Sequence, residues 1–323
     1  MIVLKSKPDS AAGALSLKLV LAFIAIYIIW GSTFLAIRYA VQTIPPLVTA
    51  GLRHSVAGTI LFAWAWLRGF RPTRRQWVAG AVQGALFFYC SHGLLHWAER
   101  YVESGMAALL MATEAIFILL FGWVLGQEKI NRYSGVGVML GIAGVALLTG
   151  AELGMKGSSM IGVAAILISS VAWSVGVVLA PRLKLPDDAL GRTALPTLCG
   201  AAMLLVTAYF TGEIHRTHWE QISLRSALGL GYLIVFGSVI AFTAYVWLLQ
   251  RVPPTLVATH TYVNPVVAVL LGWLLAGEVL NLRIVLASTV ILAAIVLVRR
   301  GERAGQSLAP GAVIEMKSSE ECA

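Results

Sequence analysis

Apolar residues recur along the chain in long runs, separated by short connections rich in charged residues, proline and glycine. A helix needs about 20 consecutive apolar residues to cross a lipid bilayer. The pattern therefore predicts an all-α polytopic membrane protein. The ten expected transmembrane helices lie near residues 19–39, 47–67, 76–98, 104–126, 133–150, 160–181, 193–212, 226–249, 255–277 and 282–298.

Composition strengthens this prediction. Of the 323 residues, 59% are hydrophobic and only 12% are charged, too few to cover the surface of a water-soluble protein of this size. The first apolar run has the length of a membrane helix and no small-residue cleavage site follows it, so we expect an uncleaved first helix and no signal peptide. The three cysteines have no spacing typical of a metal site or a disulfide framework.

The basic residues predict the orientation. The formal net charge is +9, and most of the 24 lysines and arginines fall on the side that contains the N-terminus. Cytoplasmic loops carry such an excess, so both termini are expected in the cytoplasm. We expect a cytoplasmic N-terminus over 1–18 and a disordered cytoplasmic tail over 299–323, and no nucleic-acid partner.

The two halves of the chain are related in sequence. Residues 102–131 align without a gap with residues 252–281, with matching glycine, tryptophan, glutamate and asparagine positions. This alignment predicts a duplication into five-helix units over 19–150 and 160–298. Because five is odd, the second unit enters the membrane from the opposite side. Such inverted repeats are a physical route to alternating access.

Three stretches carry a family resemblance: Ile29–Phe34 (IWGSTF), the spacing from Pro45–Pro46 to Arg53, and Tyr262–Ala268 (YVNPVVA). The chain resembles the ten-helix EamA-type permeases of the drug/metabolite transporter superfamily across residues 19–298. The resemblance implies a secondary transporter, an exporter or facilitator of a small organic solute such as an amino acid, metabolite or drug-like analogue. It also implies a location in the inner membrane, no cofactor and no enzymatic activity.

The chain departs from that family in its fourth helix and its histidines. Ala115 stands where the family often has proline, whereas Pro265 is kept in the second half. His92, His96 and His260 occupy positions where histidine is not expected. These positions are where we look for specificity.

Ionisable side chains inside the spans are functional candidates because they are costly in hydrocarbon unless paired, hydrated or turned inward. His92 and His96 are one turn apart on the third helix, and with Glu114 they could form a polar cavity that holds an amine or carries protons. Alternatively, the histidines bond to backbone groups and only fix helix packing. No carboxylate or thiol completes a metal set with them, so no metal is expected.

Arg53 lies near the outer end of the second helix. Its side chain could extend to the headgroups, pair with Glu114, or bind a substrate carboxylate. The family position favours a gating or structural role for Arg53, together with Pro265. Glu128 and Glu278 stand at equivalent helix ends and resemble loop caps more than substrate ligands.

Small hydroxyl and aromatic residues complete the candidate set, because they allow close helix approach and can wall a cavity. Asn264 is the leading uncharged candidate. The expected substrate-binding residues are Trp30, Ser32, Thr33, His92, His96, Glu114, Trp173, Ser174, His260, Tyr262 and Asn264.

Several functions stay open at this point. No nucleotide-binding motif is present, so ATP is not expected to be consumed by this chain. The alternatives to a carrier of small solutes are a membrane-embedded enzyme that uses His92, His96 and Glu114, a nucleotide-sugar or metal-ion carrier, and a channel. The expected partners are a small-molecule solute and membrane lipids, with a proton as coupling ion and a monomer or homodimer left open.

Overall fold

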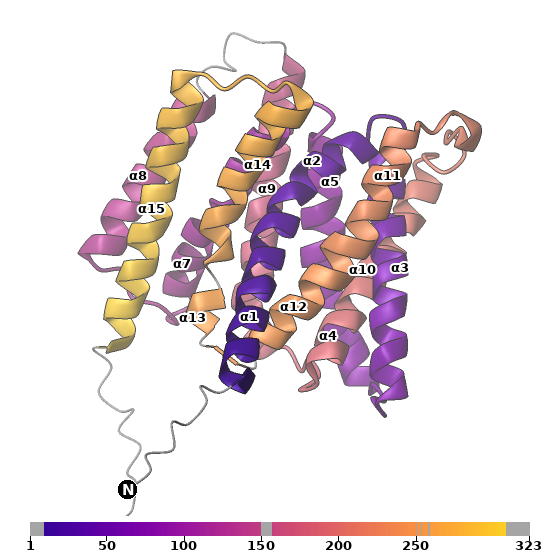
Figure 1. The fold of residues 1–323 in the computed structure, drawn as a ribbon, viewed down its shortest axis with the longest axis horizontal. Coiled ribbons are helices and arrows are strands. Elements are labelled where there is room, and N and C mark those ends of the chain that lie inside the picture. Colours follow the sequence, from indigo (N-terminus) through magenta and orange to yellow (C-terminus); the bar gives the residue numbers. More distant parts are fainter. Residues whose placement is uncertain (1–9, 150–156, 250, 253, 258, 308–323) are drawn as a thin grey trace, which may run out of the picture.

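The computed structural model describes residues 10–149, 157–249, 251–252, 254–257 and 259–307, and all regular structure in these residues is helical. The helices run side by side between two ends of one bundle (Figure 1). We call the end at the top of that view, with the loops 41–45, 99–103 and 277–281, the upper end. The opposite end, where α1 begins, is the lower end.

The helices follow the apolar runs closely. The first part of the chain forms α1 (Ser10–Ile24), η1 (Ala25–Ile29), α2 (Trp30–Ala40), α3 (Pro46–Leu67), α4 (Arg74–Gly84), η2 (Ala85–His92), α5 (Gly93–Ala98), α6 (Ser104–Met111), α7 (Glu114–Val124) and α8 (Arg132–Thr149). The second part forms α9 (Gly157–Leu179), η4 (Ala180–Arg182), α10 (Ala189–Phe210), η5 (Trp219–Gln221), α11 (Leu224–Tyr232), η6 (Leu233–Ile240), α12 (Ala241–Leu249), α13 (Pro254–Val257), α14 (His260–Ala276) and α15 (Leu282–Ser307).

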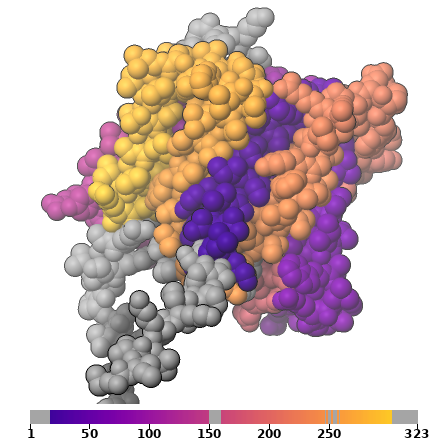
Figure 2. Space-filling model, in the orientation of Figure 1, coloured from indigo at the N-terminus to yellow at the C-terminus, as the bar shows by residue number. Residues whose placement is uncertain are grey.

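Within the described residues, eight helices are long and apolar enough to cross a membrane, and the apolar helix His260–Ala276 is shorter. Large apolar side chains stay exposed on the outside of the bundle, among them Leu21, Ile28 and Phe210. Figure 2 shows α1 at the surface, between the orange segments of the second half. An exterior this apolar is stable against lipid and not against water. The chain is therefore a polytopic membrane protein.

Helix α15 corrects one expectation. The predicted disordered tail begins at residue 299, but α15 continues to Ser307. Arginine and glutamate favour helix, and no proline occurs before Pro310, so the polar sequence after Val298 extends the helix instead of ending it. The remaining tail, 308–323, and the first part of the expected N-terminal segment, 1–9, lie outside the described residues.

The two parts of the chain are packed into each other. Helix α3 packs along α10, α8 along α15, α14 against α2 and α6, and α9 against η2, α5 and α7. At one contact the backbones of α4 and α10 meet directly. A Cβ at Gly84 would lie 2.4 Å from the carbonyl oxygen of Pro196, and one at Gly200 would lie 2.8 Å from the carbonyl oxygen of Gly84. Only glycine fits this approach.

Among the residues that the structure describes, three membrane helices contain a π-helical segment: η1, η2 and η6. Such segments disturb the regular hydrogen-bond ladder and are frequent at functional sites. Another helix is interrupted at Ala112 and Thr113, between α6 and α7, although no proline is present there. The Thr113 hydroxyl donates to the carbonyl of Leu110 at 2.6 Å, a local bond that competes with the helix. These irregularities fall where the polar residues lie.

Candidate functional site

Arg53 is buried inside the bundle. It lies nearly two turns into α3 and its exposed fraction is only 6%. Its Nε donates to the hydroxyl of Ser238 in η6 at 3.0 Å. The side chain does not extend to the headgroups, because it turns inward toward a segment from the other half of the chain. A fixed positive charge thus lies at the contact between the two halves.

Three histidines surround this arginine. His54 follows it in α3 and is buried, and its Nε2 lies 2.9 Å from Nδ1 of His92 at the end of η2. The Nδ1 of His96 donates to the carbonyl of His92 at 2.7 Å. We call Arg53, His54, His92 and His96 the polar cluster. The backbone bond of His96 is the packing role that was one of the two predicted alternatives, but the imidazole pair of His54 and His92 goes beyond it.

Aromatic rings border the polar cluster. Trp173 of α9 stacks on His92, with ring centroids 5.6 Å apart and planes at 7°. Phe87 stacks on the same indole at 4.2 Å, and Phe88 contacts both His54 and His92. Flat rings of this kind can stack on an aromatic or cationic solute. Trp173 is thus brought together with His92, as two of the predicted candidates.

A second group of rings lies where α2, α12 and α14 meet. Trp30 packs against Tyr245 at 5.1 Å and edge-on against His260 at 4.9 Å. Its indole nitrogen donates to the carbonyl of Gly237 in η6 at 2.9 Å. An ideal Cβ at Gly237 would lie 3.5 Å from Nη2 of Arg53. Gly237 therefore lies between Arg53 of the polar cluster and Trp30 of the second group of rings. We call Trp30, Tyr245 and His260 the aromatic cluster.

The residues beside Trp30 hold the halves together. The Ser32 hydroxyl lies 2.6 Å from the hydroxyl of Tyr232, and Thr33 donates to the carbonyl of Trp30 at 2.6 Å. A Cβ at Gly31 would lie 2.6 Å from Cβ of Val267, so glycine allows α2 to approach α14. In the described structure this stretch therefore makes packing contacts, and Ser32 and Thr33 already have partners.

The predicted candidates of α14 contribute in the same way. In the amide orientation that satisfies both of its ends, the Asn264 nitrogen donates to the carbonyls of Tyr27 and His260, at 3.2 and 3.1 Å. Tyr262 packs against the main hydrophobic core. Pro265 is buried within α14 and leaves the helix continuous. Asn264 thus links the first helix to α14.

Among the described contacts, Glu114 bonds neither His92 nor His96. It begins α7 after the interruption and is only partly buried by its neighbours. The charges that act on it come from Arg299, and it in turn acts on Tyr245 of the aromatic cluster. The hydroxyl of Ser174 donates to its carbonyl at 3.1 Å. The predicted grouping of Glu114 with His92 and His96 does not occur among the described contacts.

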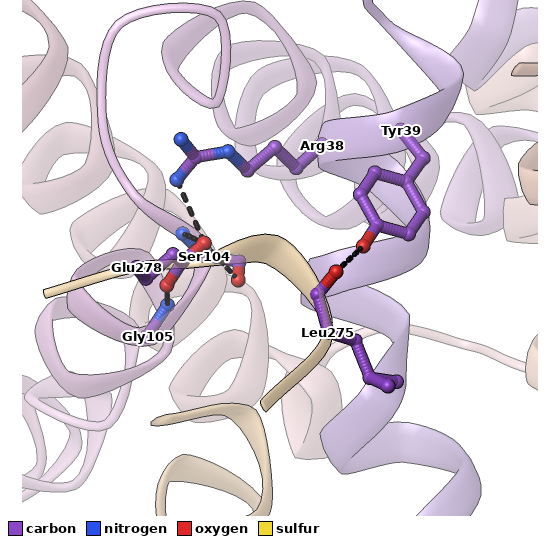
Figure 3. Close-up of polar contacts among 6 residues, drawn as sticks. All are labelled: Arg38, Tyr39, Ser104, Gly105, Leu275 and Glu278. Carbon is purple, nitrogen blue, oxygen red and sulfur yellow. Dashed lines mark hydrogen bonds and ion pairs between the residues drawn. The ribbon is translucent and has the colours of Figure 1, made fainter. Parts of the chain in front are cut away.

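Glu278 binds the two halves at the upper end (Figure 3). Its Oε1 accepts from Nη1 of Arg38 at 2.7 Å and from the amide and hydroxyl of Ser104 at 2.9 and 2.6 Å. Its Oε2 accepts from the amide of Gly105 at 3.0 Å. Nearby, the hydroxyl of Tyr39 donates to the carbonyl of Leu275 at 2.9 Å. Glu278 is indeed a helix cap, but it caps α6 in the other half and forms an ion pair. We call Arg38, Ser104, Gly105 and Glu278 the upper lock.

A pocket of about 300 Å³ opens at the upper end of the bundle. It is lined by the loop 41–45 together with Arg100, Glu213 and Arg216. The carboxylate of Glu213 accepts from the amide of Leu47 at 2.9 Å, so it caps the start of α3. The pocket therefore brings solvent-accessible space to the end of the bundle where the lock lies.

Sequence reasoning missed His54 and undervalued Glu278. His54 stands beside Arg53, but its partner His92 is far away in sequence, so no local pattern reveals the pair. Glu278 looked like a local cap because its contacts with α6 and Arg38 are tertiary. In the part of the chain that is described, no group of three or more histidine, cysteine or acidic side chains could hold a metal ion.

Comparison with known proteins gives the family. The EamA-like transporter family matches the chain twice, over residues 17–150 and 160–300. The uncharacterized inner membrane transporter YedA of Escherichia coli K12 is 38% identical over 87% of this chain and 90% of its own length. The uncharacterized transporter YoaV of Bacillus subtilis 168 is 24% identical over 85% of this chain and 94% of its own.

The fold is also found among solved structures. A crystal structure with 23% sequence identity superposes with a TM-score of 0.61, over 89% of this chain and 99% of that one. The relatives are named transporters and one is named as residing in the inner membrane, in agreement with the apolar helices of this chain. The chain belongs to the EamA-like transporter family.

Proposed function

We propose that this protein is a secondary transporter that moves a small organic solute, such as an amino acid, metabolite or drug-like analogue, across the inner membrane. In this proposal the solute binds between the halves, beside the polar cluster and Trp173. The observation that carries the proposal is the buried guanidinium of Arg53 among three imidazoles, at a contact between the two halves. A buried charge of this kind in a membrane protein typically belongs to a solute or ion pathway.

The proposed mechanism is alternating access between two inverted five-helix repeats with ten spans in all. The double family match and the reciprocal packing of α3 on α10 and of α8 on α15 support it, because these pairs are equivalent helices of the two repeats. Two-fold related halves can exchange conformations and open the site to either side. We place both termini in the cytoplasm, since the lower end carries most lysines and arginines.

In this scheme the described conformation is closed at the upper end. The upper lock and the Tyr39–Leu275 bond join the halves there. Opening to the outside requires these bonds to break and their donors to gain water. The polar cluster and the aromatic cluster form the solute site, and Arg53 holds an anionic group such as a carboxylate through its planar fork.

A transport assay tests the proposal. An overexpressing strain is screened for resistance and growth with amino acids, analogues and drugs, and each hit is measured as flux in proteoliposomes at equal pH on both sides. We expect saturable flux of at least one organic solute. Absence of flux for every hit, with folded protein in the vesicles, would contradict a carrier.

A matched pair of arginine variants tests the site. Arg53→Gln is expected to reduce flux strongly at low solute concentration by weakening apparent affinity, whereas Arg225→Gln, at an exposed arginine stacked on Tyr39, is expected to preserve flux. Equal flux from the two variants would remove Arg53 from the solute site. Arg53→Lys separates charge from geometry, because lysine keeps the charge and loses the fork.

A further inference from the structure

Glu99 is a buried acid for which the described part of the chain supplies no well-aligned hydrogen-bond donor. It follows α5 at the upper end and its exposed fraction is 3%. No donor among the described residues meets hydrogen-bond geometry with either of its carboxylate oxygens, and the backbone amide of Arg38 is the nearest group that favours the charged form from the main chain. A charged carboxylate is expensive in such a place, whereas a protonated one brings its own hydrogen.

The charged groups around Glu99 come from three other segments. Arg38 of α2 and Arg53 of α3 are the nearby cations, and Glu278 after α14 is the nearby anion. Both cations already have partners, since Arg38 pairs with Glu278 and Arg53 bonds Ser238. Helix α9, which packs along α5, contains no charged residue. Of these ionisable side chains, Glu99 is therefore the one whose carboxylate lacks a hydrogen-bond partner among the described residues.

His96 reinforces this shortage of donors. It precedes Glu99 by one turn, and its Nε2 is buried and has no partner in the described part of the chain. Its Nδ1 donates to the His92 carbonyl, so a neutral ring leaves Nε2 as an acceptor. Two side chains at the end of α5, His96 and Glu99, thus carry buried acceptor atoms to which no described residue donates a hydrogen bond.

We propose that Glu99 is a proton-binding site and that its charge sets the strength of the upper lock. The inference rests on the proposed alternating access. It is consistent with electrostatics: burial, followed by the carboxylate of Glu278, raises the pKa of Glu99 well above its usual range, against the opposing effect of Arg38 and Arg53.

The coupling follows from competition for one arginine. With Glu99 protonated, Arg38 has a single carboxylate partner, Glu278, and the upper lock is closed. When the O–H bond of Glu99 breaks, the proton passes to water and the new carboxylate attracts Arg38 and repels Glu278. Arg100, the next residue, lines the pocket at the upper end, so solvent-accessible space begins one residue along the chain from Glu99. Proton loss therefore weakens the lock and proton uptake closes it.

Infrared titration of the purified, full-length protein in lipid, without added solute, tests the proton site. We expect a C=O stretch of a protonated carboxylic acid at neutral pH that disappears as the pH rises. The Glu99 component of this band should be absent in Glu99→Gln, shifted in frequency or midpoint in Glu99→Asp, and retained in Glu114→Gln, which removes the partly buried acid of α7 and serves as the control. No titrating band, or a band unchanged in Glu99→Asp, would overturn the proposal. Glu99→Asp decides the matter if Glu99→Gln fails to fold.

Cysteine labelling tests the coupling to the lock. Val269 packs against Gly105, since a Cβ at Gly105 would lie 3.0 Å from its Cα. On a background in which Cys90, Cys199 and Cys322 are serine, we introduce Val269→Cys and measure labelling by an impermeant maleimide. Exposed Thr43→Cys normalises for the reactivity of the thiol.

We expect normalised labelling to rise several-fold as the pH rises through the infrared titration, and to stay low at every pH when Glu99→Gln is added. Labelling that does not change with pH, although the Glu99 infrared band titrates, would contradict the proposal that the charge of Glu99 sets the strength of the upper lock. These measurements need no solute. Solute flux without a pH gradient, as described above, tests the carrier itself, so the two proposals can fail separately.

Discussion

The upper lock and the polar cluster are both buried and both join the two halves, but their hydrogen bonding differs. In the upper lock the carboxylate of Glu278 is matched by a cation, a hydroxyl and two amides. In and beside the polar cluster, Nε2 of His96 and both oxygens of Glu99 have no partner among the described residues. Buried polar groups are normally paired, and exceptions call for an explanation. The upper lock, whose hydrogen bonds are complete, therefore stabilises one conformation. The polar cluster and Glu99, whose hydrogen bonds are incomplete, have the capacity to bind a solute or a proton.

The largest expected effect comes from breaking the saturated group. Glu278→Ala leaves Arg38 and the start of α6 without their acceptor, a loss of roughly 3 kcal/mol for a largely buried pair. Thermal unfolding in detergent should fall by roughly 5 °C or more. Glu278→Gln, which keeps one acceptor oxygen, should lose less. Equal stability of wild type and Glu278→Ala would show that the lock is not structural.

Arg53 sharpens the other side of the comparison. Arg53→Gln removes a charge-assisted contact of roughly 1.5–3 kcal/mol, which corresponds to a roughly 10- to 100-fold weaker apparent solute affinity in proteoliposome flux. The unfolding temperature should change less than in Glu278→Ala. If Arg53→Gln lowers the unfolding temperature strongly while the solute affinity of the remaining folded protein is unchanged, Arg53 has a structural role like that of the upper lock and does not bind the solute.

Glu99→Gln should stabilise the protein. An acid whose pKa is raised in the folded state contributes full stability below its unfolded pKa, and this contribution is lost as the pH rises toward the raised value. Glutamine removes that loss. The unfolding temperature of Glu99→Gln should therefore exceed that of wild type by a few degrees at neutral pH, and the gap should widen as the pH increases. A gap that narrows with rising pH would contradict the assignment.

Tyr39→Phe is expected to have the smallest effect. Its hydroxyl bond to the Leu275 carbonyl is exposed to solvent, so the loss is about 0.5–1 kcal/mol. Thermal unfolding should shift by only about 1–3 °C. A loss as large as that of Glu278→Ala would mean that the lock extends to this tyrosine.

Much of the fold follows from the sequence. The apolar runs locate the helices because a membrane span must be long and apolar, and Pro46 marks the start of α3. The predicted end of the last helix, at residue 298, was wrong. The apolar run ends there, at the membrane surface, whereas Arg299 and Arg300 still favour helix. The π-helical segments and the interruption before Glu114 have no local sequence signal.

The candidate site is only partly readable from the sequence. The cost of charge in lipid singles out Arg53, His92 and His96 as inward-facing residues. The sequence does not predict their hydrogen-bond partners, because Ser238 and His54 meet Arg53 and His92 through tertiary contacts. The same limit explains why Glu114 was grouped with the histidines when its neighbours are Ser174 and the aromatic cluster.

One consequence of the Glu278 contacts concerns cooperativity. A single carboxylate serves four donors at once, on α2 and at the start of α6. A partial displacement would strand several of these donors together before water could replace the acceptor, so intermediate positions are high in free energy. The upper end should consequently behave as a two-state switch with a sharp barrier and no graded series of openings.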